Sequence, residues 1–213
     1  MNNTLKTQLK NWYPVLQETL ESNYFKQTKL SIKEDMATEE IYPKGSDILK
    51  AFSLCPIEET KIVIIGQEPY HDGTATGLAF ANPTKCEIIS PELEVIIEEL
   101  ETTVGMIALL FNTALTVKRG APGGHIALWD KFTIEFLQSF SKIKTNVVYM
   151  LWGKYAQDYE QYIAKGNYIL KADHPISEIY KNKGNFLGCD HFNLANDIIS
   201  KNYGEDEKIQ WLY

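Results

Sequence analysis

The chain has 213 residues, a length that suits a single domain spanning residues 1–213. Its composition, 44% hydrophobic and 12% aromatic, allows a sizeable buried core and argues against a disordered chain. The formal net charge of −7 argues against a broad basic surface that would neutralise nucleic-acid phosphates. Any contact with a nucleic acid therefore has to be local.

Targeting and metal-binding signals are missing from the sequence. No apolar run approaches the roughly 20 residues that a membrane span needs, and the polar residues 1–10 lack the apolar core of a signal peptide. We therefore expect an intracellular, cytoplasmic protein that is neither secreted nor bound to a membrane. Cys55, Cys86 and Cys189 lie far apart without Cys-x-x-Cys spacing, so we expect reduced, buried thiols and no metal site.

Helical patterns dominate the first 60 residues. Apolar side chains at helical spacing are typical of a helix packed on a core, and here they are Leu5, Leu9, Trp12 and Leu16. A turn at residues 43–45 follows, and a second apolar helical stripe covers residues 48–54.

Short apolar runs then alternate with helical patterns. Runs typical of strands buried on both faces cover residues 61–66, 107–111, 147–151 and 168–170. Helical patterns cover residues 91–102, with Pro91 at a first helical position, and residues 129–140 and 156–164. This alternation predicts an α/β fold: a three-layer α/β/α sandwich around a central, four-stranded, mainly parallel sheet.

Polar clusters follow each of the four predicted strands. They are residues 66–71, 112–116, 152–153 and 173–175. Because ligands of such sheets bind beyond the carboxyl ends of the strands, we expect the four clusters to converge in one cleft.

These clusters carry a resemblance to the family 1 uracil-DNA glycosylases. Residues 66–71 read Gly-Gln-Glu-Pro-Tyr-His where the family has Gly-Gln-Asp-Pro-Tyr-His, and residues 77–80 match its Gly-Leu-x-Phe. Further ordered matches are residues 109–117 followed by His125, residues 151–157, residues 188–192, residues 41–43 and Trp211. The resemblance covers nearly the whole chain and implies the same four-stranded parallel sheet between helical layers.

The resemblance implies a catalytic pair. Glu68 takes the place of the aspartate that orients the attacking water and stabilises the cation-like sugar, and His174 that of the histidine that donates to the departing uracil oxygen. Asn112 matches the asparagine that reads uracil, since an amide offers a donor and an acceptor side by side. Each residue also has a plain structural interpretation, such as a surface glutamate in a turn or a buried, satisfied histidine.

The resemblance also implies the walls of a base pocket. Tyr70 matches the aromatic that lies against uracil C5, and Phe80 the aromatic that stacks on the flipped base. Gln67 would supply backbone contacts, and His71 would lie near the DNA phosphates.

Four departures from the family pattern bear on activity. Glutamate replaces aspartate at Glu68, and the loop at residues 72–77 is one residue shorter than usual. Glu92 stands where the family has a phosphate-binding serine; at the start of a helix it could instead stabilise the helix N-terminus. The loop after His174 has no residue that matches the intercalating leucine. Its candidates are Ile176 and Ile179 for the wedge and Ser177 for a phosphate contact.

The resulting hypothesis is a monofunctional uracil-DNA glycosylase that needs no cofactor, since the matched loops at the four polar clusters contain no lysine to form a Schiff base. Its partner is uracil-containing DNA; an inhibitor protein in the DNA cleft is a further candidate, and the resemblance implies a monomer. One alternative is an attenuated glycosylase-fold protein that binds uracil-DNA or another protein. Another is a nucleotide-binding enzyme, although the Gly-x-x-x-x-Gly-Lys spacing is absent.

Overall fold

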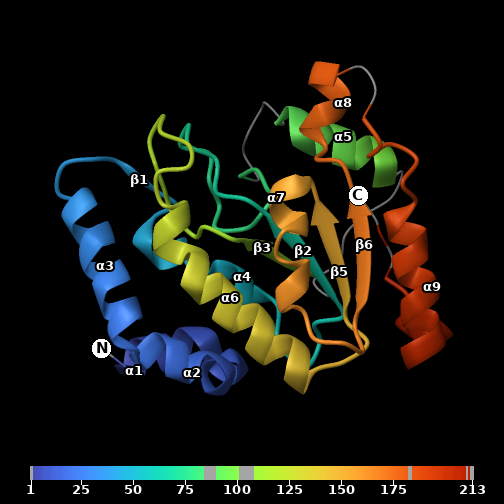
Figure 1. The fold of residues 1–213 in the computed structure, drawn as a ribbon, viewed down its shortest axis with the longest axis horizontal. Coiled ribbons are helices and arrows are strands. Elements are labelled where there is room, and N and C mark those ends of the chain that lie inside the picture. The colour runs from blue at the N-terminus through green and yellow to red at the C-terminus, as the bar shows by residue number, and fades with distance from the viewer. Residues whose placement is uncertain (1, 84–89, 101–107, 182–183, 210, 212–213) are drawn as a thin grey trace.

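The centre of the fold is a sheet of four strands in the order β3-β2-β5-β6 (Figure 1). The computed structural model describes residues 2–83, 90–100, 108–181, 184–209 and 211. The strands are β2 (Ile62–Gly66), β3 (Ala108–Asn112), β5 (Val148–Trp152) and β6 (Tyr168–Ala172). All three pairings are parallel, so the predicted three-layer α/β/α class is confirmed.

Side chains of β2 alternate between the two helical layers. Val63 and Ile65 belong to one core cluster, whereas Ile62 and Ile64 belong to the other, and all four are buried. A strand that is buried on both faces is what the β-branched run predicted.

One helical layer comes mainly from the first half of the chain (Figure 1). Its elements are α1 (Asn2–Leu9), η1 (Lys10–Trp12), α2 (Tyr13–Glu21), α3 (Asn23–Asp35), η2 (Gly45–Asp47), α4 (Lys50–Leu54) and α6 (Ile126–Ile143). Ser22 caps α3 by accepting a hydrogen bond from the Phe25 amide at 3.1 Å. The predicted helix at residues 129–140 lies inside α6.

The other layer holds α5 (Pro91–Leu100), α8 (Ile176–Lys181), α9 (His191–Tyr203) and η4 (Glu205–Glu207). In Figure 1, α8 and α5 lie together above the carboxyl ends of β5 and β6, while α9 runs beside β6. The helix predicted from Pro91 begins there, and residues 101 and 102 of that prediction lie outside the described part.

Two features differ from the sequence-based prediction. The single helix predicted for residues 156–164 is wrong, because the chain forms α7 (Lys154–Gln157) and η3 (Glu160–Tyr162). Between them, buried Tyr159 donates from its hydroxyl to Asp130 at 2.7 Å, which ties the segment to α6. A two-stranded antiparallel pair, β1 (Ile41–Tyr42) with β4 (Val117–Lys118), was not predicted.

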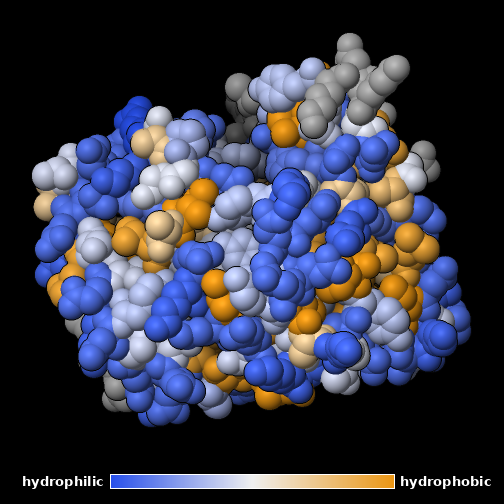
Figure 2. Space-filling view, viewed as in Figure 1, coloured by the Kyte–Doolittle hydropathy of each residue, from blue (hydrophilic) through white to orange (hydrophobic). Residues whose placement is uncertain are grey.

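The polarity of the surface and the burial of the cysteines are two further features of the fold. Figure 2 shows a face that is mostly hydrophilic, with small scattered groups of hydrophobic residues. Within the described ranges, none of the helices combines the length and the apolar character that crossing a membrane requires. Cys55 is buried and Cys189 is half-buried, and Cys86 lies outside the described residues.

An aromatic cluster joins α6 to the sheet. The fully buried Phe136 ring lies 4.8 Å from the Phe111 ring on β3 and 5.2 Å from the Phe52 ring on α4, between ring centroids. The rings of Trp12 and Phe140 lie within 5.9 Å of it. Phe52 and Trp12 meet Phe136 edge to face, whereas Phe140 stacks on it, and such ring contacts add to the stabilisation from buried apolar area.

Removing the Phe136 ring is expected to destabilise the fold. Phe136→Ala should lower the free energy of unfolding by about 3–5 kcal/mol, because it removes buried area and leaves a cavity. Urea unfolding measures the change. The control Ile143→Ala, on the same helix at a side chain that is 61% exposed, should stay within about 0.5 kcal/mol of the wild type. Equal losses in both variants would contradict this account of the core.

Candidate active site

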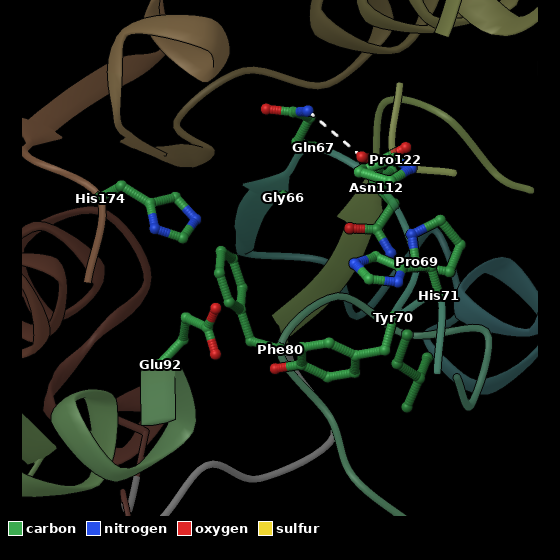
Figure 3. Close-up of a pocket in the computed structure, with 12 residues that line it drawn as sticks. Gly66, Gln67, Pro69, Tyr70, His71, Phe80, Glu92, Asn112, Pro122 and His174 are labelled. Atoms are coloured by element: carbon green, nitrogen blue, oxygen red, sulfur yellow. Dashed lines mark hydrogen bonds between the residues drawn. The ribbon is translucent and has the colours of Figure 1, made fainter. Parts of the chain in front are cut away.

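A cavity of about 240 Å³ opens at the carboxyl ends of the strands, where ligands of parallel sheets bind. It is lined by residues 66–71, Leu78, Phe80, Glu92, Asn112, Pro122 and His174 (Figure 3). The lining includes both residues predicted to be catalytic, all four predicted to bind the base, and His71. The structure therefore brings together the carboxyl ends of β2 and β3 and the segment that follows β6, whereas residues 152 and 153 of the fourth predicted cluster are not among the described lining residues.

Asn112 lies over the backbone of Gly66, its Cα partner in the β2–β3 register. A Cβ at Gly66 would collide with the Asn112 Oδ1 atom and would approach the Ala79 Cβ to 2.9 Å. Past the strands, the Thr113 amide donates to the Gly66 carbonyl at 3.0 Å, and the Thr113 hydroxyl to the Gln67 carbonyl at 2.8 Å. Asn112 is thus fixed as a polar side chain on the cavity wall.

The Glu68 carboxylate lies at the rim of the cavity. Both of its oxygens accept from the Gly123 amide, at 3.0 and 2.9 Å, and Oε1 also faces the Gln67 side-chain amide at 3.4 Å. Figure 3 shows the Gln67 side chain turned away from the cavity. A hydrogen bond from a backbone amide to a carboxylate is charge-assisted, so Gly123 orients Glu68.

The segment that carries Gly123 is tied to the rest of the rim. The Arg119 amide donates to the Glu40 carbonyl at 2.8 Å, and the Arg119 guanidinium forms an ion pair with the Glu40 carboxylate. The Gly120 amide donates to the His71 carbonyl at 3.0 Å. These contacts hold segment 119–124 against the loop of Glu68.

A buried polar chain anchors the other end of this segment. Trp129 Nε1 donates to Thr116 Oγ1 at 2.7 Å, which leaves the Thr116 hydroxyl to donate to His125 Nδ1 at 2.8 Å. His125 Nε2 then faces Asp35 Oδ2 at 3.1 Å, and Lys118 contacts the second oxygen at 2.5 Å. The hydrogen bond from Lys118 lowers the pKa of Asp35, and the hydrogen bond from His125 lowers it further. His125 is fully buried, and its role in this chain of hydrogen bonds is structural.

His174 presents one ring nitrogen to the cavity. Its Nδ1 accepts from the Ile176 amide at 3.2 Å, so in the neutral ring the proton is carried by Nε2. Burial lowers the pKa of His174, which keeps the ring neutral at pH 7. Gly153 (φ +85°) makes room for the ring, since a Cβ there would lie 2.9 Å from the His174 Cβ.

Two aromatic side chains shape the cavity. The Phe80 ring lies 5.7 Å from the His174 ring and 5.4 Å from the Trp152 ring, between centroids. Phe80 has a positive φ of 53°, a conformation that costs energy and is concentrated at functional sites. The Tyr70 hydroxyl bonds to Ser90 Oγ at 2.6 Å, and burial raises the pKa of Tyr70 to about 12.

Glu92 lines the cavity, although the sequence placed it only at the position of a phosphate-binding serine or at a helix N-terminus. It lies in the first turn of α5, as the helix-terminus interpretation expected, but its side chain also lines the cavity beside Phe80 (Figure 3). A sequence pattern can predict where a helix begins, but it does not predict which loops the first turn of that helix faces. Among the described lining residues, Glu68 and Glu92 are acidic and none is lysine or arginine.

The predicted DNA-contact residues of α8 lie beside the cavity and outside its lining. Ile176 is half-buried, and Ser177 is only 6% exposed with its hydroxyl turned inward. Ile179 is 42% exposed, and its neighbour Tyr180 is 80% exposed. The exposure of Tyr180 was not predicted, because exposure on a six-residue helix cannot be inferred from the sequence pattern. The DNA contacts of all these residues stay predictions.

Comparison with known sequences finds one consistent family. The model of the uracil DNA glycosylase superfamily matches residues 52–199, well over half of the chain. A uracil-DNA glycosylase of Fusobacterium nucleatum is 37% identical over 219 residues, covering 94% of each chain. One from Flavobacterium johnsoniae is 35% identical over 218 residues, covering 94% of this chain and 97% of the relative.

Solved structures agree on the fold. The crystal structure of mimivirus uracil-DNA glycosylase superposes with a TM-score of 0.87 at 20% identity, covering 98% of this chain and 89% of that chain. A variant of the mimivirus protein in complex with UGI gives the same TM-score and identity, with 98% and 91% coverage.

The contact between Gly66 and Asn112 can be tested directly. Gly66→Ala should displace the Asn112 amide and cost about 1–3 kcal/mol of unfolding free energy, because the new methyl group overpacks the strand pair. The control is Gly45→Ala, where an added Cβ meets nothing within 4 Å. Urea unfolding and a crystal structure of each variant provide the measurements. An undisturbed Asn112 in the Gly66 variant would refute the steric argument.

Proposed function

The chain belongs to the uracil-DNA glycosylase superfamily, and on that premise we propose that it hydrolyses the N-glycosidic bond of deoxyuridine in DNA. The products are free uracil and an abasic site, which begins base-excision repair. The observation that carries the proposal is the shared cavity, which Glu68 and His174 line together with Asn112 and Phe80. A cavity of this kind requires the target nucleotide to leave the base stack.

Glu68 is proposed to act on the sugar side of the base. The oxygen of a water molecule bonds to C1′ while the bond from C1′ to uracil N1 breaks, and the bonding electron pair leaves with uracil. The proton that the water loses passes to the departing uracil or to solvent. A carboxylate stabilises the positive charge that develops on the sugar and orients the water.

His174 is proposed to act on the departing base. With Nδ1 occupied by the Ile176 amide, Nε2–H is the donor available to the uracil oxygen on which charge collects. A neutral ring suits this role, and burial favours the neutral form.

Three side chains are proposed to select uracil. The Asn112 amide offers a donor and an acceptor that match uracil N3–H and O4 but not the reversed edge of cytosine. Phe80 would stack on the base, and Tyr70 would occupy the space that a thymine methyl group needs. The backbone of Gln67 would complete the pocket.

DNA contacts are proposed for the cavity rim and α8. His71 is exposed at the rim, where it would lie near the path of the phosphates. The exposed side chains of Ile179 and Tyr180 would enter the space left by the flipped base, with half-buried Ile176 behind them. Ser177 would reach a phosphate only after turning outward, since its hydroxyl is buried.

The acidic groups predict weak binding to DNA. Glu92 adds a negative charge to the cavity where the resemblance placed a phosphate-binding serine. Carboxylates repel the DNA phosphates, and salt screens this repulsion. The affinity for DNA would therefore depend mainly on contacts with the inserted base rather than on phosphate contacts.

The proposed partners follow from the reaction. Uracil-containing DNA is the proposed substrate. We also propose that the protein acts as a monomer in the cytoplasm, where such DNA is accessible. Because a variant of the mimivirus protein has been solved in complex with UGI, an inhibitor protein in the DNA cleft is a further candidate partner.

Glu68 variants test the proposal. The wild type should produce alkali-labile abasic sites in single-stranded and duplex uracil DNA, and Glu68→Gln should lower kcat about 10²-fold or more by removing the charge. Glu68→Asp should raise kcat about tenfold or more, because misplacement by about 1 Å can cost on the order of 10²-fold. Intact uracil DNA at high enzyme would refute the proposal. Binding without cleavage in both the wild type and Glu68→Asp would favour the binding-module alternative.

The pH dependence tests the neutral His174 ring. Its pKa lies below the ordinary histidine value of about 6.5, so the ring stays neutral as pH falls through that value. We expect kcat to hold from about pH 8 to 6.5 and to fall only at lower pH. Below about pH 6.5 the unfolded chain binds more protons than the folded one, so unfolding free energy should also fall there, and less so in His174→Gln. An acidic limb of kcat centred above about 6.5 would contradict the assignment.

A further inference from the structure

Two carboxylates, one on either side of His174 in the sequence, accept hydrogen bonds from the backbone amides of a segment that follows α8. Asp173 precedes the histidine, and Glu178 lies four residues after it. All four amides of residues 184–187 donate to these two side chains. We name this arrangement the carboxylate clamp.

Glu178 makes most of the clamp. Its Oε1 accepts from the Phe186 amide at 2.7 Å and from the Leu187 amide at 2.9 Å, and its Oε2 accepts from the Gly184 amide at 3.1 Å. A carboxylate that accepts several backbone hydrogen bonds is held more firmly than a surface ion pair, since backbone donors lose little entropy on bonding.

The geometry leaves little freedom for this carboxylate. A Cβ on Gly184 would lie 2.5 Å from Glu178 Oε1, so the backbone of residue 184 approaches the side chain directly. Asp173 Oδ2 takes the remaining amide, that of Asn185, at 3.3 Å.

The far side of the clamp is fixed to the sheet. Phe186 is fully buried, and its ring lies 4.9 Å from that of Trp152 in an edge-to-face contact. Trp152 is the last residue of β5 and is itself buried. Phe186 therefore anchors the segment that supplies the donor amides of residues 184–187.

The near side of the clamp is continuous with His174. The first turn of α8 bonds to this residue twice: the Ser177 amide donates to its carbonyl at 2.8 Å, and the Ile176 amide to its Nδ1 at 3.2 Å. A shift of α8 would therefore change both the place of the ring and the nitrogen that carries its proton.

We propose that Glu178, assisted by Asp173, is a positioning residue that holds α8 so that His174 keeps Nε2–H directed into the cavity. Glu178 itself lies outside the described lining of the cavity. The catalytic consequence rests on the proposed glycosylase function. The structural consequence, the state of the His174 ring, does not.

Variants of Glu178 separate positioning from general stability. Glu178→Ala removes all three acceptor contacts, whereas Glu178→Gln keeps the oxygen that serves Phe186 and Leu187 and loses the one that serves Gly184. The control is Glu18→Ala, an exposed position on α2. The measurements are kcat and KM on single-stranded uracil DNA and the ¹⁵N NMR shifts of the His174 ring nitrogens.

Glu178→Ala should lower kcat about 10- to 100-fold, as expected for a displaced catalytic group, with KM changing less than about threefold. Its His174 ring should show both tautomers, where the wild type shows Nε2–H alone. Glu178→Gln should fall between, and Glu18→Ala should match the wild type.

A kcat for Glu178→Ala within about twofold of the wild type would overturn the proposal, and so would an unchanged His174 tautomer. Should Glu178→Ala fail to fold, Glu178→Gln decides: a kcat and a tautomer equal to those of Glu18→Ala overturn the proposal, and a loss in both supports it. A wild type inactive on uracil DNA would remove the glycosylase function, and the NMR shifts would still decide whether the clamp sets the His174 ring.

Discussion

The parallel pairing of β2 with β3, in the register that puts Gly66 opposite Asn112, is the constraint on which the cavity depends. Parallel strands end at the same edge of a sheet, so the loop of Glu68 and the amide of Asn112 meet there without further guidance. The missing side chain at Gly66 is what lets the two strand ends approach so closely. A slip of one residue would point Asn112 to the opposite face of the sheet.

The two proposed catalytic groups are oriented by backbone amides. Gly123 donates to both oxygens of Glu68, and Ile176 donates to Nδ1 of His174. Backbone amides on packed segments lose little entropy when they bond, so both groups are arranged before any substrate arrives. The segments that supply these amides are held in turn by side chains well outside the cavity, His125 with Asp35 on one side and Glu178 on the other.

Charge separates this cavity from an ordinary DNA-binding surface. Its described lining holds two carboxylates and no lysine or arginine, and Arg119 at the nearby rim is paired with Glu40. Recognition would therefore rest on the shape and hydrogen bonding of one inserted base rather than on phosphate contacts. Burial lowers the pKa of His174 and favours the neutral ring, in which Nε2–H remains a hydrogen-bond donor.

Local patterns in the chain were sufficient for the sheet and for a cleft at the ends of its strands, whereas the individual site residues were assigned from the family resemblance. The β-branched run before Gly66 identified a strand buried on both faces, and the polar residues after it pointed to a cleft, because both signals depend on neighbours in sequence. Tertiary structure alone decided that residues 156–164 break into two short pieces, that Glu92 faces the cavity, and that Tyr180 rather than Ser177 faces solvent. The physical reason is that each of these outcomes is set by contacts with segments distant in sequence, such as that between Tyr159 and Asp130, and no local period encodes them.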